Sequence, residues 1–338
     1  PQPPGSDPSM VPPGSDAITR MPSAGSAAPP PATGDEPAVT PADDGTGGDD
    51  VSMDGPQSTP PEDATVTPPA GAPCNGKAGA AGTSTRSVMN GALNRTFLVH
   101  IPASLDPNTA APVVFVHHGF TMSGQIMLDL TGFADVADRE GFIAVFPDGG
   151  GAAPWNVGTG ICGVGAVVAG VEDDFAFVDK MIESVDADHC VDRERVMTTG
   201  FSMGGYFSNH IGCQHGGTKI RAIAPHSGGT YAGDCPGDPI PVMLLHGTGD
   251  ALITPNCGTD ARDQWLTRNG CSSEFESRQV QGGTCDWYMG CPPGGQVVMC
   301  QFNGMAHAWA GAPQGLYGSG PAFESATELV WDFFSQNL

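Results

Sequence analysis

Short runs of apolar, often β-branched residues recur along the chain after residue 90, and amphipathic segments separate several of them. The runs predict strands at residues 96–101, 113–117, 142–146, 196–201, 222–225, 242–246 and 297–302. The amphipathic segments predict helices at residues 174–185, 205–213, 260–269 and 322–336. Because strands that alternate with helices form parallel sheets covered on both faces, the pattern predicts an α/β fold with a mostly parallel central sheet.

The first 73 residues differ in composition and show no such pattern. They hold 18 of the 32 prolines of the chain, no aromatic residue, and 11 acids against the single base Arg20. A segment of this kind buries too little apolar surface to fold. We therefore expect a disordered acidic linker at 1–73 and one folded domain at 74–338, a length typical of a single α/β domain.

Charge and hydropathy narrow the possible partners. The net charge is −24, of which about −10 falls in residues 1–73, so nucleic acid and anionic membranes are disfavoured as partners. No apolar run has the length of a membrane span, and no signal peptide is visible from Pro1 onward, which leaves open what precedes Pro1. The sequence does not indicate an oligomeric state.

Cysteines occur only in the predicted domain. There are ten, at positions 74, 162, 190, 213, 235, 257, 271, 285, 291 and 300. The even number predicts up to five disulfides and an oxidising compartment, although the sequence leaves their pairing open. No C-x-x-C spacing occurs, so we expect no metal site. We expect a secreted protein, or one tethered to the cell surface through residues 1–73.

The segment TTGFSMGG, which follows the predicted strand at 196–201, contains a candidate nucleophile. Ser202 stands between Gly200 and Gly204, and a helical segment follows. A serine on a tight strand-to-helix turn projects its hydroxyl outward, and the backbone can reverse direction only where the residues two positions before and two positions after the serine are small. This context predicts a nucleophile elbow at Ser202.

A serine nucleophile needs a histidine base and a carboxylate that orients the histidine. Asp250 follows the apolar run of 242–246, and His307 follows that of 297–302. The order Ser202, Asp250, His307 is that of an α/β-hydrolase. Asp173 and Asp174 are rival acids, but their position predicts the cap and first turn of a helix.

The segment VVFVHHGF predicts the loop that completes an oxyanion hole. In α/β-hydrolases one oxyanion donor follows the third strand and the other follows the nucleophile, which here indicates the backbone N–H groups of Phe120 and Met203. A metal site at His117 and His118 is disfavoured, because adjacent strand residues point to opposite faces.

Taken together, these segments resemble the secreted carbohydrate esterases, a group that includes feruloyl and acetylxylan esterases and the related polyhydroxybutyrate depolymerase-like esterases. The resemblance covers residues 74–338. It rests on Cys74 and Gly76-Lys77 before RTFLVHIP, then HHGF, GFIAVFPDG, WNVG, DDFAFVDKMI, HCVDRERVMTTGFSMGG, IPVMLLHGTGD, C-x5-C-x8-C, AHAW and ATELVWDFF. It implies an α/β-hydrolase fold stabilised by disulfides, with Ser202 as nucleophile, Asp250 as acid and His307 as base.

The resemblance also implies a reaction. We expect a serine esterase that works through an acyl-enzyme without a cofactor, on feruloyl or related hydroxycinnamoyl esters of plant cell-wall polysaccharide. Acetyl esters of xylan come second, followed by a polyester such as polyhydroxybutyrate. A peptidase is disfavoured, because oligopeptidases of this fold usually carry a large additional domain. A non-catalytic surface protein with a hydrolase fold is the alternative from another class.

The sequence gives weaker indications of substrate-binding residues. His118, Gly119, Trp155 and Trp309 are candidates, and the two tryptophans and Phe120 either line an aromatic acyl pocket or belong to the core. One departure from the family is the Met-Ala pair before His307, where Gly-Gly or Gly-Asp is common. We expect it to alter the shape of the loop more than the chemistry.

Overall fold

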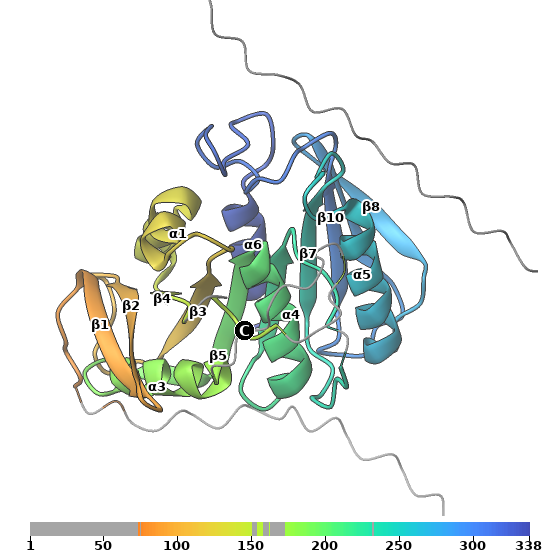
Figure 1. The fold of residues 1–338 in the computed structure, drawn as a ribbon. Helices are drawn as coiled ribbons and strands as arrows, with labels where there is room; N and C mark the ends of the chain where they lie inside the picture. The colour runs from red at the N-terminus through yellow and green to blue at the C-terminus, as the bar shows by residue number, and fades with distance from the viewer. Residues whose placement is uncertain (1–73, 75, 151–153, 158–161, 163–172, 232) are drawn as a thin grey trace, which may run out of the picture. The chain divides into compact units, whose positions relative to one another are not determined.

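The computed structural model describes residues 74, 76–150, 154–157, 162, 173–231 and 233–338 (Figure 1). The predicted linker at 1–73 lies outside the described residues. The strands are β1 (Gly82–Asn90), β2 (Leu93–Ile101), β3 (Ala111–His117), β4 (Ile143–Pro147), β5 (Val191–Phe201), β6 (Ala222–His226), β7 (Val242–Gly247), β8 (Phe275–Val280), β9 (Gly283–Tyr288) and β10 (Val297–Phe302). The helices are α1 (Gly124–Thr131), α2 (Phe133–Glu140), α3 (Asp174–Asp186), α4 (Met203–His215), α5 (Pro255–Asn269) and α6 (Ala326–Ser335).

The strands of the described part form one sheet in the order β1-β2-β4-β3-β5-β6-β7-β10-β9-β8. The strands from β4 to β10 in this order pair in parallel. Antiparallel strands extend the sheet at both ends, β2 and β1 beside β4, and β9 and β8 beside β10. The predicted α/β fold with a mostly parallel sheet is therefore confirmed, and the predicted strands form the parallel part and its neighbour β2.

The two faces of the sheet carry separate cores. Along β3, Val113 and Phe115 belong to the core under α3, α4 and α5, whereas Val114 and Val116 belong to the core under α1, α2 and α6. This alternation follows from the two-residue period of a strand. In Figure 1, α4 and α5 lie in front of the sheet. Helices thus cover both faces, as the sequence predicts.

Local chemistry fixes where the helices begin. Asp173 caps α3 by accepting a hydrogen bond from the Ala176 N–H at 2.9 Å, as its position in the sequence predicts. Helix α5 begins five residues before the predicted start because Pro255 occupies its first turn, where its missing N–H costs nothing. Helices α1 and α2 are additional to the prediction. They are short and are separated by Gly132, whose φ is 71°.

Five disulfides join all ten cysteines, which confirms the prediction of a disulfide-stabilised domain and supplies the pairing that the sequence leaves open. Cys285–Cys300 links neighbouring strands β9 and β10, and Cys162–Cys257 ties a residue of the β4–α3 connection to α5. The others are Cys74–Cys190, Cys213–Cys235 and Cys271–Cys291.

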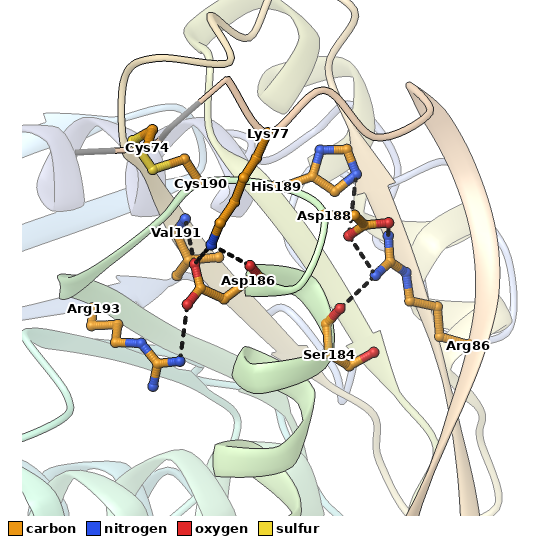
Figure 2. A network of polar contacts seen from close by, with 10 residues as sticks. All are labelled: Cys74, Lys77, Arg86, Ser184, Asp186, Asp188, His189, Cys190, Val191 and Arg193. Atoms are coloured by element: carbon orange, nitrogen blue, oxygen red, sulfur yellow. Dashed lines mark hydrogen bonds and ion pairs between the residues drawn. A yellow bond between two sulfur atoms is a disulfide. The ribbon is translucent and has the colours of Figure 1, made fainter. Parts of the chain in front are cut away.

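A set of contacts, which we call the N-terminal clamp, holds the start of the described domain against the α3–β5 connection (Figure 2). It consists of the Cys74–Cys190 disulfide, the Lys77–Asp186 ion pair at 3.0 Å and the Arg86–Asp188 ion pair at 2.9 Å. The Gly79 N–H also donates to the Asp188 carbonyl at 3.0 Å. The clamp therefore fixes this segment at the amino end of β5.

Candidate active site

Ser202 is the single residue between the end of β5 and the start of α4, and its backbone adopts the conformation of a sharp turn. Its φ is 57° and its ψ is −116°, a region that costs a residue with a Cβ atom about 1 to 3 kcal/mol. Its N–H donates to the carbonyl of His226 on β6 at 2.9 Å, and its carbonyl accepts from the Tyr206 N–H at 3.0 Å. Hydrogen bonds on both sides thus hold the turn in this conformation.

Backbone crowding explains the two glycines of the elbow. A Cβ atom on Gly200 would lie 2.5 Å from backbone atoms of Gly204 and 2.8 Å from the carbonyl oxygen of His117. A Cβ atom on Gly204 would overlap the same carbonyl. Strand β3, the turn and α4 therefore meet backbone to backbone, as expected for a nucleophile elbow.

Asp250 and His307 lie in the loops after β7 and β10 and contact each other. The Nδ1 atom of His307 is 2.6 Å from Oδ2 of Asp250. The Oδ1 atom of Asp250 accepts hydrogen bonds from the N–H groups of Leu252 and Ile253, each at 2.9 Å. Burial alone raises the pKa of the Asp250 carboxyl, but the His307 and Ile253 hydrogen bonds hold that pKa below its usual value. The carboxylate is therefore charged and fixed in orientation.

The position of His307 relates it to the elbow. Its ring centroid is 4.6 Å from that of Phe201, the residue before Ser202. A carboxylate that accepts from Nδ1 keeps the proton of a neutral imidazole there, so Nε2 remains free to act as a base. The structure thus brings the three predicted residues to the carboxyl ends of β5, β7 and β10.

The Met-Ala departure before His307 has a structural role in joining two loops. Met305 is buried in the core between the sheet and α6, and its carbonyl accepts from the Gly249 N–H at 3.0 Å. A Cβ atom on Gly249 would lie 2.6 Å from the carbonyl oxygen of Gly304. The loop that carries His307 therefore packs directly against the loop that carries Asp250.

Two buried histidines that the sequence analysis does not single out support the site. His246 Nε2 is 3.6 Å from Asp250 Oδ2 and 2.9 Å from the Ile253 carbonyl oxygen. His226 stacks on Trp309, with ring centroids 4.9 Å apart, and its Nε2 accepts from the Ala310 N–H at 3.2 Å. Burial lowers the pKa of both imidazoles, which favours their neutral forms. Their place at the ends of two predicted strands is the signal that would have identified them.

The predicted oxyanion loop lies against the elbow. A Cβ atom on Gly119 would be 3.2 Å from Cβ of Ser202. The His118 ring is engaged on both sides, with Nδ1 2.7 Å from the Gly119 carbonyl oxygen and Nε2 accepting from the Gly149 N–H at 2.9 Å. This requires a neutral ring with its proton on Nδ1, consistent with the pKa of His118, which burial lowers. Met203 is the first residue of α4, so its N–H has no acceptor within the helix.

The sequence is similar to those of several known esterases. No family model matches the chain. It is 28% identical over 270 residues to feruloyl esterase D of Neurospora crassa. This alignment covers 75% of this chain and 86% of the relative. The chain is 29% identical over 267 residues to feruloyl esterase B of Piromyces equi. This alignment covers 72% of this chain but only 45% of the relative. A bifunctional acetylxylan esterase/xylanase of Neocallimastix patriciarum is 26% identical over 251 residues, and the match spans 33% of its length.

Solved structures agree on the fold. The acetyl xylan esterase from Aspergillus awamori superposes with a TM-score of 0.55, covering 75% of this chain and 99% of that chain at 14% identity. The S-formylglutathione hydrolase from Agrobacterium tumefaciens has a TM-score of 0.50 at 12% identity, covering 77% and 98%. This chain has the fold of the α/β-hydrolases and is similar in sequence to feruloyl esterases.

The predicted substrate-binding residues differ in accessibility. Phe120 is 52% exposed, whereas Trp155 and Trp309 are each 1% exposed and His118 is also buried. Trp155 stacks on Phe207, with centroids 5.2 Å apart. Burial favours the alternative interpretation of the two tryptophans as core residues, and a direct contact with substrate stays a prediction.

Asp174 has a partner that the sequence does not indicate. It forms an ion pair with Arg95 of β2 at 2.5 Å, with both side chains almost fully buried. Its Oδ2 also accepts from the Asn156 N–H at 2.6 Å, and Arg95 donates to the Asp148 carbonyl at 3.1 Å. Through Asn156 this pair contacts the segment that carries Trp155, and both carboxylate oxygens of Asp174 are engaged.

Trp155 connects the segment of residues 154–157 to the predicted oxyanion loop. Its Nε1 donates to the carbonyl oxygen of His118 at 2.7 Å. Within the described ranges, no group of three or more His, Cys, Asp or Glu side chains is arranged to hold a metal ion. Among the described helices, none is long and apolar enough to cross a membrane.

Proposed function

We propose that this chain is a serine carboxylic ester hydrolase that releases ferulic or related hydroxycinnamic acids from plant cell-wall polysaccharide. The observation that carries the proposal is the His307–Asp250 hydrogen bond beside the strained Ser202 turn, in a chain whose relatives include feruloyl esterases. The relatives support an ester hydrolase, and the site has the groups that ester hydrolysis needs.

The proposed reaction begins with attack of Ser202 Oγ on the ester carbonyl while His307 Nε2 takes the hydroxyl proton. The backbone N–H groups of Phe120 and Met203 stabilise the oxyanion, each contributing about 3 kcal/mol in the transition state. The imidazolium, stabilised by Asp250, then protonates the leaving alcohol and an acyl-serine remains. Water, activated by the same histidine, releases the acid and restores Ser202, so every proton transfer passes through His307.

Acetyl esters of xylan are the second candidate substrate. The relative from Neocallimastix patriciarum is named as an acetylxylan esterase and xylanase, and its match covers 72% of this chain. Polyhydroxybutyrate is the further alternative that the sequence leaves open. The acyl group thus separates the candidates, because the proposed chemistry at Ser202 is the same for each.

One experiment tests the activity and distinguishes these substrates. Initial rates of the wild-type chain and Ser202→Ala are measured on methyl ferulate, acetylated xylan and a polyhydroxybutyrate suspension. We expect ferulate release by the wild type and a loss of about 10⁴-fold or more in the variant. A variant that keeps a tenth of the rate contradicts the role of Ser202. Cleavage of acetylated xylan or polyester without ferulate release replaces the preferred substrate.

We also propose that the protein works outside the cell, with polysaccharide as its partner. Five disulfides support an oxidising compartment. Tethering to the cell surface through residues 1–73 belongs to the same proposal.

A further inference from the structure

A groove of about 250 Å³ lies between α1 and the loop that follows His307. Ile126, Asp129 and Leu130 of α1 form one wall, and these positions share a helix face because they are three and four residues apart. The opposite wall is formed by the loop from Pro313 to Gly318, which includes Leu316 and Tyr317. In Figure 1, α1 and the connection between β10 and α6 lie at the same end of the sheet.

The loop wall is held in place by the segment that carries His307. The Trp309 N–H donates to the Tyr317 carbonyl at 2.7 Å, and the Ser319 N–H donates to the Trp309 carbonyl at 3.2 Å. A Cβ atom on Gly318 would overlap the carbonyl oxygen of Pro313, so the loop closes tightly on itself. The wall is therefore fixed two residues from the proposed base.

Aromatic contacts place the groove on the histidine side of the site. The ring centroids of Tyr317 and Phe201 are 6.4 Å apart, and those of Phe201 and His307 are 4.6 Å apart. In an acyl transfer, the histidine protonates the oxygen of the leaving alcohol, so this alcohol lies on the histidine side. Through Tyr317 and Phe201 the groove is thus connected to the histidine side, on which the leaving group lies.

The chemistry of the walls suits a polyhydroxylated ring. Leu316 is 83% exposed, so its apolar surface is accessible to a ligand in the groove. The exposed carboxylate of Asp129 accepts from Gln125 Nε2 at 2.9 Å through Oδ1 and has a second oxygen for ligand hydroxyl donors. Apolar and aromatic surface packs against the C–H faces of a sugar, and a carboxylate accepts hydrogen bonds from its hydroxyls.

We propose that this groove binds the sugar ring of the leaving alcohol and so determines the preference of the enzyme for sugar esters. This inference rests on the proposed function and adds to it the residues that recognise the alcohol part of the substrate. Leu316 and Tyr317 pack on the ring, and Asp129 accepts hydrogen bonds from its hydroxyls. A methyl ester has no group that reaches the groove, so its hydrolysis does not depend on these side chains.

The test compares esters that share the acyl group and differ in the alcohol. The substrates are methyl ferulate, feruloyl arabinose and feruloyl glucose. The variants are Leu316→Ala and Asp129→Ala. The matched control is Leu93→Ala, because Leu93 is also an exposed leucine but lies on β2 and does not line the groove. We expect each groove variant to lower kcat/KM about fivefold or more on at least one sugar ester and to leave methyl ferulate unchanged. The control should change neither.

The outcomes distinguish a failure of the groove assignment from a failure of the proposed esterase activity. Equal losses on methyl and sugar esters overturn the assignment of the groove to the alcohol. Unchanged rates on both sugar esters overturn it as well, and melting curves of the variants confirm that they are folded. A wild-type chain that cleaves none of the three feruloyl esters refutes the preferred substrate. Cleavage of methyl ferulate with no groove effect refutes the groove alone.

Discussion

The imidazole of His307 and the carboxylate of Asp250 are joined across 2.6 Å, although 57 residues separate them in the chain. The carboxylate is inaccessible to solvent, and its other oxygen is bound by two backbone N–H groups. The loop from β7 therefore presents one oxygen of Asp250 to the histidine and retains the other. Oδ2 of Asp250 therefore fixes the orientation of the imidazole, while Oδ1 remains bonded to the backbone of its own loop.

This pair predicts a dependence of stability on pH. The folded pKa of Asp250 lies below its unfolded value, so the charged carboxylate contributes stability that is present above the unfolded pKa. That contribution is lost as the pH falls through the folded pKa, below about pH 4. Urea unfolding of the wild-type chain and Asp250→Asn across the acid range should show the difference between them shrinking as pH falls. A constant difference down to pH 2 would contradict the shift.

The backbone of Ser202 predicts that the elbow stores strain. Ser202→Gly and Ser202→Ala both remove the hydroxyl, but glycine adopts a φ of 57° without a Cβ penalty. We expect the glycine variant to be more stable than the alanine variant by about 1 kcal/mol, measured by chemical denaturation. Both variants should lack esterase activity. Equal stabilities would show that the surrounding hydrogen bonds, rather than strain, set the free energy of unfolding.

Trp155 is predicted to act on catalysis by positioning the oxyanion loop. Trp155→Phe keeps an aromatic ring but removes the hydrogen bond to the His118 carbonyl. We expect kcat on methyl ferulate to fall about tenfold with little change in KM, because the oxyanion donors act mainly in the transition state. Trp265→Phe is the matched control, since it removes a buried indole bond of similar length, 2.8 Å to Asn209, from α5. A similar fall in both variants would point to a general loss of packing.

The disulfides should differ in how much they stabilise the domain. Cys74–Cys190 closes a separation of 116 residues and Cys285–Cys300 one of 15. In the chain-entropy account, the longer loop contributes more, about 5 kcal/mol against about 3. Paired serine variants of each disulfide, compared by denaturant unfolding, should show the larger loss for the first. A larger loss for the short loop would mean that local geometry at β9 and β10 dominates.

The accuracy of the sequence predictions follows the kind of signal that each feature leaves in the chain. The parallel strands are buried on both faces, so their apolar runs are continuous and easy to recognise. Strand β8 is FESRQV and mostly exposed, so it carries no such run. Gly132 interrupts the pattern of α1 and α2, and neither helix is long enough to show a clear period. The prediction therefore misses β8 because it has no apolar run, and misses α1 and α2 because each has only eight residues.

Contacts between distant residues leave no local signal. The Arg95–Asp174 pair joins β2 to the start of α3, and nothing in either segment indicates the other. The cysteine count predicts the number of disulfides but not their partners, because many pairings satisfy the same count. By contrast, Ser202 combines a motif with the strand and helix that the motif requires, so the turn itself was predictable.

The N-terminal clamp and Ser202 occupy opposite ends of one strand. Cys190 precedes β5 and Ser202 follows it, and the 11 residues between them extend over about 35 Å. Any load applied through the chain before Cys74 therefore enters the domain through a covalent crosslink at the base of its central strand. The turn at Ser202 lies a full strand length from that crosslink, so the covalent attachment and the proposed nucleophile are separated by the whole of β5.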